Sequence, residues 1–356
     1  MLYLFLAFLV IVTMYVGIVL SCLFGWNKSP QKSANLSAAI QAVTVVIAVR
    51  NEENNLRALL QGLQQQTYAD FEVLLINDHS DDNGKAVFTS FSDSRFKWIN
   101  ADEMGKKASL RKGIQLAKQG LILTTDADVV LPPTWIDSMV RLYSQTSAQL
   151  LIGPVTMSKG TIFQRIDYSS IEGVTHGSAQ IGCPVLCSGA NLAFSKVWYE
   201  SCLPYLKPEM ASGDDMFLLE ATKRLGGKIV STKAPEATVQ ISGCSSVQQL
   251  LAQRSRWASK APRYSDVGIC FVAVIVAFTQ VACLTSLLLG AWYPLLFLVF
   301  LLKFVVDALL IGCVSCHHHT LKDMLYYPVV ALVYPFYVLF VLLLTLFPNQ
   351  WKKRTL

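Results

Sequence analysis

Long apolar runs at both ends of the chain constrain the fold more than any other feature of the sequence. Leu2–Phe24 carries no charged residue and is long enough to cross a bilayer as a helix. Three more runs of similar length follow near the other end: Val267–Leu289, Ala291–Cys313 and Leu325–Phe347. They explain why 53% of the residues are hydrophobic and only 15% are charged. We therefore expect an integral membrane protein with an anchor at residues 1–24, a domain of ordinary soluble composition at 25–266, further transmembrane helices at 267–347 and a basic tail at 348–356.

Basic residues beside the apolar runs predict the side of the membrane on which residues 25–266 lie. The first run is followed by Lys28 and Lys32, and the second is preceded by Arg254, Arg256, Lys260 and Arg263. Positive charge collects on the cytoplasmic side, so the middle domain is predicted to be cytoplasmic, in a bacterial inner membrane. The tail Trp351–Arg354 is also basic, although three further crossings would place it outside. Pro328 and Pro335 leave a kinked or re-entrant last segment open.

The cysteines do not indicate a disulfide framework, and several of the nine lie inside apolar runs. An uncleaved anchor is favoured over a secretory signal or a lipoprotein site at Cys22, because no basic residue precedes the first run. Cys313-Val-Ser-Cys316-His317 matches a haem attachment string, and these residues also offer metal ligands. We favour a third reading, a polar loop between two spans.

Strand-like and helix-like segments alternate in the first part of the middle domain. Short apolar runs predict strands at Val43–Val49, Phe71–Ile76, Phe96–Ile99 and Leu121–Thr125. Helices are predicted between them, at Asn55–Gln65 and Lys107–Lys118. This alternation indicates an α/β domain with a doubly wound, mostly parallel sheet, and such sheets bind ligands beyond the carboxyl ends of their strands. Polar clusters lie at those ends, at Arg50–Glu53, Asn77–Asp78 and Asp126–Asp128.

Asp126-Ala-Asp128 directly follows the last of these strands. Two carboxylates one residue apart suit a hard divalent cation, Mg²⁺ or Mn²⁺, which in turn can hold a diphosphate. The chain has neither the GxGxxG nor the GxxxxGK[ST] pattern, so acidic groups rather than a glycine-rich loop are predicted to manage the phosphates.

Several motifs in order resemble those of family 2 glycosyltransferases, which are inverting sugar transferases with a GT-A fold. The resemblance runs from about Val43 to Arg263. Its motifs are Val46-Ile-Ala-Val-Arg-Asn-Glu-Glu53, Leu74-Leu-Ile-Asn-Asp78, Gly105-Lys-Lys-Ala-Ser-Leu-Arg-Lys-Gly113, Asp126-Ala-Asp128 (DxD), Ser188-Gly-Ala-Asn-Leu-Ala-Phe194, Gly213-Asp-Asp215 and Gln253-Arg-Ser-Arg-Trp257 (QxxRW). Each motif is weak alone, and the order of all of them makes the resemblance specific.

The resemblance implies a role for each matching residue. A nucleotide-sugar donor, with uridine as the implied base, would be bound by Glu52, Asp78, Lys106, Asp126 and Arg256. Asp126 and Asp128 would hold the cation that neutralises the leaving diphosphate. Asp215 would be the catalytic base that deprotonates the acceptor hydroxyl, and a single displacement would invert the anomeric carbon. The acceptor would contact Asn191, Asp214, Gln253 and Trp257.

Each of these residues also has a structural alternative. Asp126 and Asp128 would cap a turn, Asp214 and Asp215 would complement the dipole of a helix at Met216–Leu225, and Glu52 and Glu53 would begin another helix. The residues Gln253–Trp257 would form a basic helix at the membrane surface, which is compatible with the motif. Lys303 and Asp307, inside an apolar run, are spaced to pair on one helix face, and lipid or acceptor binding stays open for them.

Two kinds of acceptor and two other classes of protein remain open. A membrane lipid or lipid-linked acceptor is favoured over a growing glycan that the protein would extend and export, because about four spans are few to line a polymer channel. An inactive membrane scaffold with the same fold is the alternative outside enzymes, and a transporter is disfavoured because four spans offer no repeat symmetry. The expected partners are a nucleotide sugar, a lipid or glycan acceptor and the bilayer, with no nucleic acid.

Overall fold

The apolar run Val43–Val49 forms β1, a central strand of the main sheet. The computed structural model describes residues 2–28, 42–207, 210, 213–347, 350–351 and 354–355. The chain divides into two compact units. The sheet unit comprises Ser29–Ser158 and Leu186–Ser242, and the helical unit comprises Met1–Lys28, Lys159–Val185 and Gly243–Leu356. Lys32 and several residues of the tail lie outside the described residues, so the predictions made for them are not tested here.

Strands and helices alternate along the sheet unit. Its elements are β1 (Val43–Val49), α2 (Glu53–Gln64), β2 (Phe71–Asn77), α3 (Gly84–Thr89), β3 (Phe96–Asn100), α4 (Lys106–Leu116), β4 (Leu121–Thr124), β5 (Val129–Val130), α5 (Trp135–Thr146), β6 (Leu150–Ile152), β7 (Val155–Lys159), β8 (Leu192–Ser195), α7 (Lys196–Cys202), η1 (Leu203–Tyr205), α8 (Asp214–Arg224), β9 (Ile229–Ser231), η2 (Pro235–Ala237) and β10 (Val239–Ser242).

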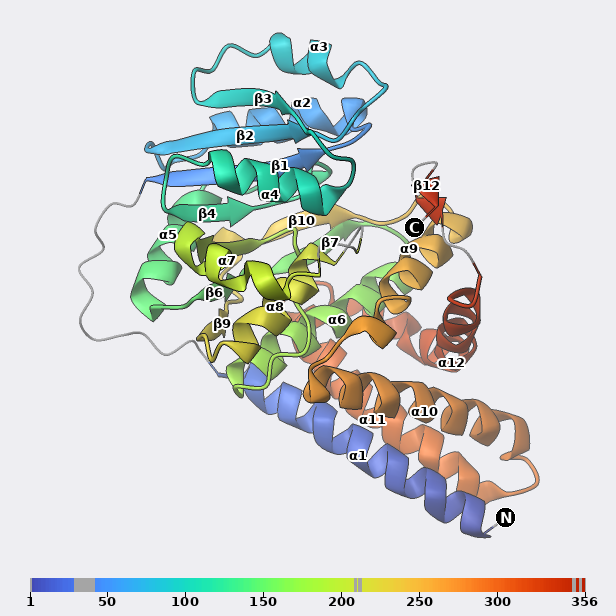
Figure 1. The fold of residues 1–356 in the computed structure, drawn as a ribbon. Helices are drawn as coiled ribbons and strands as arrows, with labels where there is room; N and C mark the ends of the chain where they lie inside the picture. The colour runs from blue at the N-terminus through green and yellow to red at the C-terminus, as the bar shows by residue number, and fades with distance from the viewer. Residues whose placement is uncertain are drawn as a thin grey trace. The chain divides into compact units, whose positions relative to one another are not determined.

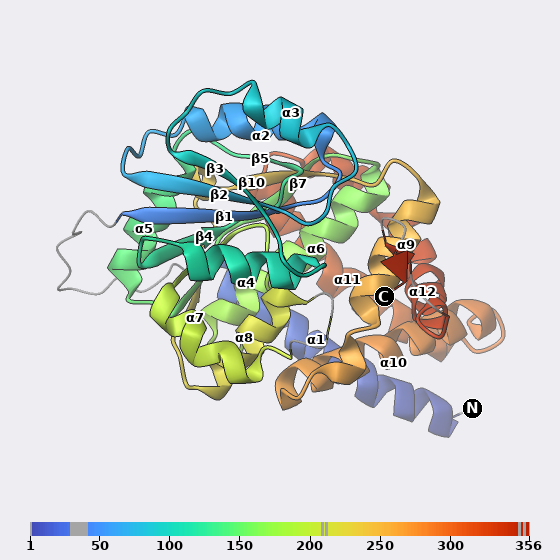
Figure 2. The same ribbon diagram turned by 45° about the horizontal axis from the view of Figure 1, so that its top comes forward.

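Within the described residues the main sheet has seven strands in the order β3-β2-β1-β4-β8-β6-β9 (Figure 1). β3, β2, β1 and β4 run parallel, and β8 is antiparallel to both of its neighbours. α2 and α4 cover opposite faces of the strands (Figure 2). A smaller sheet has the order β5-β10-β7. The expected α/β class with a mostly parallel sheet is confirmed.

Apolar spacing explains why these segments form strands and covering helices. β1 is buried along nearly its whole length, as expected for a strand with helices on both faces. In α2, the buried residues Leu56, Leu59, Leu60 and Leu63 recur at helical spacing and form the face that packs inward. The polar residues that follow β1, β2 and β4 are therefore held at one edge by a rigid core.

The helical unit contains the apolar runs. Its elements are α1 (Leu2–Trp26), α6 (Ile162–Gln180), α9 (Val247–Ala258), η3 (Ala261–Arg263), α10 (Val267–Leu289), α11 (Pro294–His317), η4 (Leu321–Tyr326), α12 (Tyr327–Leu344), β11 (Gln350–Trp351) and β12 (Arg354–Thr355). Among the described residues four helices are long and apolar enough to cross a membrane: α1, α10, α11 and the segment Leu321–Leu344, which includes α12. One such helix precedes the sheet strands and three follow them, as expected.

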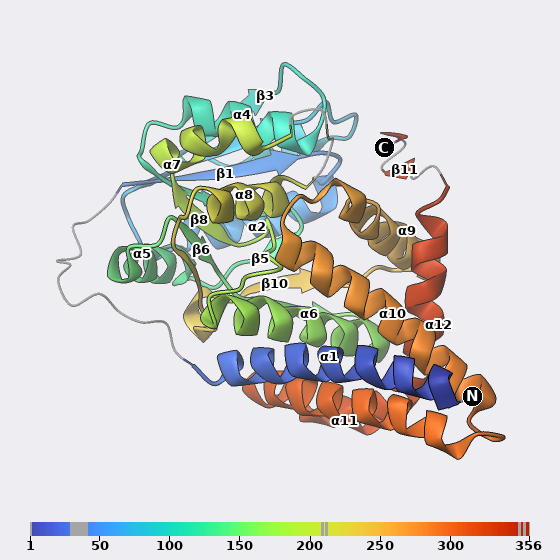
Figure 3. The ribbon, with the colours of Figure 1, turned by 60° about the horizontal axis from the view of Figure 1, so that its bottom comes forward.

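One detail of this unit differs from the sequence expectations, and another places the two prolines of the last apolar run. Cys313–His317 was expected to be a polar loop, but it forms the end of α11, where Val314 and Ser315 are still buried. Pro328 lies in the first turn of α12, where a proline needs no hydrogen-bond partner, and Pro335 lies inside the helix. Figure 3 shows α12 running across the direction of α1 and α11 instead of parallel to them.

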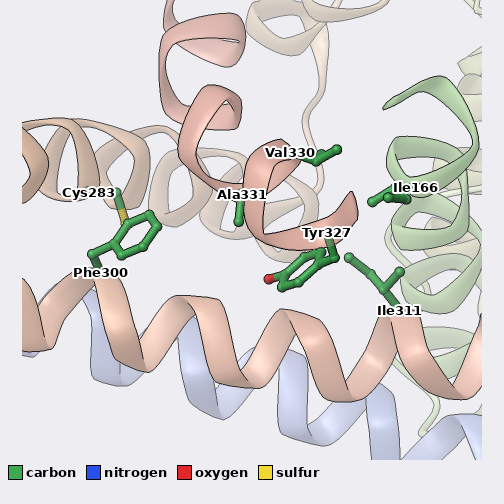
Figure 4. Packing of buried hydrophobic residues seen from close by; sticks show 7 residues of the cluster. All are labelled: Ile166, Cys283, Phe300, Ile311, Tyr327, Val330 and Ala331. Atoms are coloured by element: carbon green, nitrogen blue, oxygen red, sulfur yellow. The ribbon is translucent and has the colours of Figure 1, made fainter. Parts of the chain in front are cut away.

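Buried side chains join the helices of this unit. One cluster brings together α6, α10, α11 and α12 through Ile166, Cys283, Phe300, Ile311, Tyr327, Val330 and Ala331 (Figure 4). In this cluster the Tyr327 hydroxyl donates to the carbonyl oxygen of Phe304 at 2.8 Å, which ties α12 to α11. Two further clusters pack α1 against α11 and α10, with Val19, Val306 and Val314 in one and Val12, Ala282 and Val299 in the other.

The α1 and α6 helices lie side by side in this unit (Figure 3), and their backbones meet at a glycine on each helix. A Cβ added at Gly25 would collide with the backbone of Gly177, and one added at Gly177 would collide with the backbone of Cys22. Small residues allow helix backbones to approach this closely in membranes. α1 is therefore packed into the helical unit along with the later helices.

This crossing predicts the effect of adding single methyl groups. Gly177→Ala should destabilise the protein by about 1–3 kcal/mol, because a methyl group inserted into close-packed backbone forces the helices apart. Gly17→Ala, in α1 with open space around the glycine, is the matched control and should leave stability unchanged. Thermal unfolding of both variants in the same detergent measures the difference. Equal melting temperatures for the two variants would contradict the close crossing.

Candidate active site

Three parallel strands end at the same edge of the main sheet and deliver polar residues there. β1 lies between β2 and β4, with Val49 opposite Asn77 and Val46 opposite Thr124. Arg50, Asp78 and Asp126 follow the ends of these strands. In parallel sheets this edge is where ligands bind.

Lys106 lies at the centre of the acidic residues. It is the first residue of α4, after Gly105, whose φ of 118° suits glycine. Its Nζ is 2.6 Å from Oδ1 of Asp126 and 3.7 Å from Oδ2 of Asp214. Burial alone would lower the pKa of Lys106, but Asp126, Asp214 and Asp215 raise it above the usual value, so the ammonium stays charged. Lys106 therefore connects the residues predicted for the donor with those predicted for the acceptor.

Asp128 is an exposed residue whose carboxyl is crowded by like charges. Partial removal from water and the charges of Asp126 and Glu52 raise the pKa of this carboxyl to about 6, against the smaller opposing effect of Lys106. Glu52 precedes α2, and its Oε2 accepts from the side chain of Asn55 at 2.8 Å. Electrostatic crowding of this kind favours binding of a cation.

The second acidic pair begins α8. Gly213 has φ of 91° and precedes Asp214 and Asp215, which complement the positive end of the helix dipole. Oδ2 of Asp215 accepts from the backbone N–H of Gly189 at 3.1 Å, and Oδ1 accepts from that of Met216 at 2.8 Å. The pair thus begins a helix, as the structural alternative expected. The two hydrogen bonds orient the Asp215 carboxylate, which is compatible with a chemical role.

Gly189 belongs to the motif Ser188–Phe194, but the sequence did not predict a role for this glycine. Thr125, directly after β4, donates from Oγ1 to the carbonyl oxygen of Ala190 at 2.8 Å and fixes the loop beside the acidic cluster. A Cβ at Gly189 would lie 3.1 Å from Oδ2 of Asp214 and 3.4 Å from Nζ of Lys106. The closeness of Gly189 to Asp214 and Lys106 is visible only in the folded structure.

Asp78 is almost completely buried and binds the residue that precedes α4. Its Oδ1 accepts from the backbone N–H of Gly105 at 2.8 Å, and Arg50 donates to its carbonyl oxygen at 3.0 Å. The next residue, His79, has φ of 53° in the turn that follows β2. Contact of Asp78 with a nucleotide base stays a prediction, whereas its support of the Lys106 helix is visible.

Asn191 was predicted to contact the acceptor, and the structure gives it a different environment. Its side chain has no exposed surface. The carbonyl Oδ1 accepts from the Trp135 indole at 2.9 Å, and Nδ2 donates to the carbonyl oxygens of Pro154 and Ala237, each at 2.8 Å. These three hydrogen bonds hold the Asn191 side chain inside the core, where it supports the loop, and contact of Asn191 with an acceptor stays a prediction.

Gln253, Arg256 and Trp257 belong to α9 in the helical unit, whereas the acidic cluster belongs to the sheet unit. Oε1 of Gln253 accepts from Arg254 at 3.2 Å. The Arg254 guanidinium lies 4.2 Å from the centre of the Trp257 ring, so one face of this ring is covered. Stacking of an acceptor sugar on Trp257 stays a prediction for the other face. Arg254 itself was not assigned a role from the sequence, since only its burial distinguishes it from Arg256.

The acidic cluster fits a cation that the donor helps to hold. Among the described residues no three His, Cys, Asp or Glu side chains form a complete metal cage, and this includes Cys313, Cys316 and the neighbouring histidines. Magnesium in phosphate-transfer sites is commonly held by one or two carboxylates together with substrate phosphates. Asp128, crowded by carboxylates and open to solvent, suits such a ligand, while Lys106 already neutralises one oxygen of Asp126.

The raised pKa of Asp128 predicts a pH-dependent stability that a cation reverses. A carboxyl with a folded-state pKa above its ordinary 3.8 stabilises the fold at low pH, and this contribution is lost as the pH rises through about 6. In chelator, Asp128→Asn should therefore melt at a higher temperature than the wild type above about pH 6, and the difference should shrink toward about pH 4. Mn²⁺ should raise the melting temperature of the wild type above about pH 6, and leave that of Asp128→Asn unchanged.

A matched control for this measurement is Asp70→Asn, which removes an exposed carboxylate elsewhere in the sheet unit. It should follow the wild type with and without Mn²⁺. Equal stabilisation of Asp128→Asn and the wild type by the cation would contradict the role given to Asp128.

Comparison with known proteins identifies the family. The description "Glycosyl transferase family 2" matches residues 44–192, and "Glycosyl transferase family group 2" matches residues 121–347, which is more than half of the chain. A putative glycosyltransferase, EpsH, of Bacillus subtilis is 32% identical over 102 residues, 28% of this chain and 30% of that protein. A poly-beta-1,6-N-acetyl-D-glucosamine synthase of Staphylococcus epidermidis is 26% identical over 168 residues, 44% of this chain and 40% of the synthase.

An undecaprenyl-phosphate 4-deoxy-4-formamido-L-arabinose transferase of Sodalis glossinidius is 30% identical over 113 residues, 30% of this chain and 35% of the transferase. The chain thus spans less than half the length of each of these relatives. Among solved structures, the mannosyltransferase PcManGT of Pyrobaculum calidifontis, in complex with GDP-Man and Mn²⁺, superposes with a TM-score of 0.58 and 16% identity, over 94% of this chain and 97% of that one. This likeness supports the GT-A fold expected from the sequence. By fold and by the extent of the family match, the chain belongs to the family 2 glycosyltransferases.

Proposed function

We propose that the chain is an inverting glycosyltransferase, which moves a sugar from a nucleotide sugar to an acceptor at a membrane. The observation that carries the proposal is the position of Lys106 between Asp126 and Asp214, at the carboxyl edge of the sheet. This lysine pairs with Asp126 of the DxD motif and also with Asp214 of the acidic pair that begins α8. These are the two groups that displacement of a diphosphate by a hydroxyl requires.

Asp126 and Asp128 are proposed to hold Mg²⁺ or Mn²⁺ together with the donor diphosphate. The bound cation supplies charge neutralisation of the leaving group. PcManGT was solved with Mn²⁺ and GDP-Man, which supports a divalent cation in this fold. Uridine remains the proposed base, from the resemblance of the motifs, with Glu52, Asp78, Lys106 and Arg256 as donor contacts. The arginine is suited to bidentate phosphate binding.

Asp215 is proposed to be the base. The acceptor hydroxyl oxygen forms a bond to the anomeric carbon while the bond from that carbon to the diphosphate oxygen breaks. The proton of the hydroxyl passes to Asp215, and the nucleoside diphosphate leaves with the bonding electron pair. The Gly189 and Met216 N–H groups hold both oxygens of this carboxylate, which restricts its orientation. Asp214, paired with Lys106, would contact the acceptor with Gln253 and Trp257.

A membrane lipid or lipid-linked alcohol is the proposed acceptor, with residues 25–266 on the cytoplasmic side. The helices long enough to cross a membrane and the name of the undecaprenyl-phosphate relative support this choice. The poly-N-acetylglucosamine synthase among the relatives supports the alternative, in which a polymer is extended and exported. An inactive scaffold is the remaining alternative, and the intact acidic cluster argues against it.

Label transfer distinguishes these possibilities. Membranes that contain the protein are incubated with radiolabelled UDP- and GDP-sugars, with and without chelator, and then extracted with organic solvent. We expect label in the solvent phase, dependent on cation. Asp215→Asn should reduce transfer by about 10²- to 10⁴-fold, the usual contribution of a positioned base. Label in a large water-soluble product would replace the lipid proposal with the processive one, and no transfer from any donor would favour the scaffold.

Gly189 provides a further test of the same cluster. Gly189→Ala places a methyl group against Asp214 and Lys106, and we expect transfer to fall by about tenfold, or ~1.4 kcal/mol of transition-state stabilisation. Gly120→Ala has open space around the new methyl group and should retain full activity. Initial rates at matched protein levels measure both. Full activity of Gly189→Ala would place the reacting groups elsewhere.

A further inference from the structure

Arg254, inside the QxxRW segment, is turned into the helical unit and paired there. Its side chain is 8% exposed and that of its partner Asp167 on α6 is 3% exposed. Nε and Nη2 of Arg254 both donate to Oδ2 of Asp167, at 3.1 and 2.7 Å. Burial alone would lower the pKa of Arg254, but Asp167 raises it, so the guanidinium stays charged. Loss of one partner would leave a buried charge, which is strongly destabilising.

The remaining oxygen of Asp167 connects this pair to α12. Oδ1 of Asp167 accepts from the Tyr334 hydroxyl at 2.9 Å. Both oxygens of the carboxylate are therefore engaged, one with α9 and the other with α12. α9 also packs directly against α12. Asp167 thus connects α9, which carries the QxxRW residues, to α12.

Lys303 of α11 lies beside Tyr334 and extends these polar contacts from α12 to α11 and α1. The Lys303 ammonium lies 5.2 Å from the centre of the Tyr334 ring and 5.6 Å from that of Tyr15. It pairs with Asp307 at 2.5 Å, and the Tyr15 hydroxyl donates to Asp307 at 2.7 Å. Charges are rare inside membrane helices and pair where they occur. The contacts from Trp257 to Tyr15 therefore join α9, α6, α12, α11 and α1.

Helix geometry shows why burial of Arg254 matters for its neighbours. At about 100° per residue, Arg256 lies roughly 160° around the helix from Arg254, and Gln253 and Trp257 lie between them on the same side. α9 has only two other buried residues, Leu250 and Ser255. The ion pair is thus a buried, directional contact that fixes the rotation of α9, and this rotation decides where Gln253, Arg256 and Trp257 point.

We propose that Asp167, through Arg254 and Tyr334, is a positioning residue that sets the rotation of α9 for sugar transfer. The proposal rests on the proposed function for its effect on catalysis, because α9 carries three of the residues assigned to donor or acceptor. It rests on the structure alone for its effect on α9. Neither Asp167 nor Arg254 is placed against substrate.

The test uses a variant that removes both charges at once, Asp167→Asn with Arg254→Gln, so that no unpaired charge remains buried. The matched control is Arg165→Gln with Asp323→Asn. That pair also starts on α6 and makes two hydrogen bonds of 2.7 Å, but it joins α6 to η4 and does not involve α9. Both full-length proteins are compared with the wild type in the same detergent by thermal unfolding, hydrogen exchange and initial rates.

We expect faster amide exchange in residues 247–258 of the Asp167/Arg254 variant, with exchange in the main sheet unchanged. We expect its kcat/KM for transfer to be about 10- to 100-fold below that of the control variant, as for misplaced reacting groups. Arg254→Lys, which keeps the charge, should retain more activity than Arg254→Gln. The control pair should leave exchange in α9 and kcat/KM at wild-type values.

Exchange in α9 that equals the wild type overturns the inference, whether or not transfer is detected. Activity of the double variant within twofold of the control also overturns it. Faster exchange in α9 with no transfer by the wild type from any donor would support the anchoring of α9 and reject the proposed function, so the two failures are distinguishable.

Discussion

Carboxylates gathered at one edge of a sheet repel one another, and the candidate site depends on how this repulsion is balanced. Lys106 neutralises part of it from the start of α4, where Gly105 and Asp78 fix the turn. The pKa of Asp128 nevertheless stays raised by partial removal from water and by the charges of Asp126 and Glu52, which the Lys106 ammonium offsets only in part. Under the proposed function, a cation and a diphosphate would bind together more readily than either alone, because each ligand relieves the charge that opposes the other.

The helical unit solves a related problem in an apolar environment. Two of its buried or half-buried carboxylates accept hydrogen bonds from other helices: Asp167 from both α9 and α12, and Asp307 from α1. Apolar packing alone fixes helices in a membrane weakly, since lipid tails solvate leucine as well as a neighbouring helix does. Directional hydrogen bonds to carboxylates supply the orientation that apolar contacts such as Val19 with Val306 do not.

The predictable parts of the protein are those with periodic signals. The runs at Val43–Val49 and Val267–Leu289 were predicted to the residue because buried strands and membrane helices need continuous apolar sequence. Proximity across the chain carries no such signal. The three hydrogen bonds that bury the Asn191 side chain and the burial of Arg254 against Asp167 depend on residues far away in the sequence, so no local pattern predicts them. The importance of Gly189 likewise lies in its closeness to Lys106 and Asp214, which the local sequence does not indicate.

An anchor that only tethers a domain can be exchanged for any apolar helix or removed, and α1 does not have that freedom. Its backbone meets α6 at Gly25, and its Tyr15 donates to Asp307 within α11. Removal of α1 from the chain would leave Asp307 without the hydrogen bond from Tyr15 and would expose α6 at Gly177. Attempts to obtain a soluble fragment by trimming the amino terminus would therefore unsettle the helices that follow the sheet, more than two hundred residues away in the sequence.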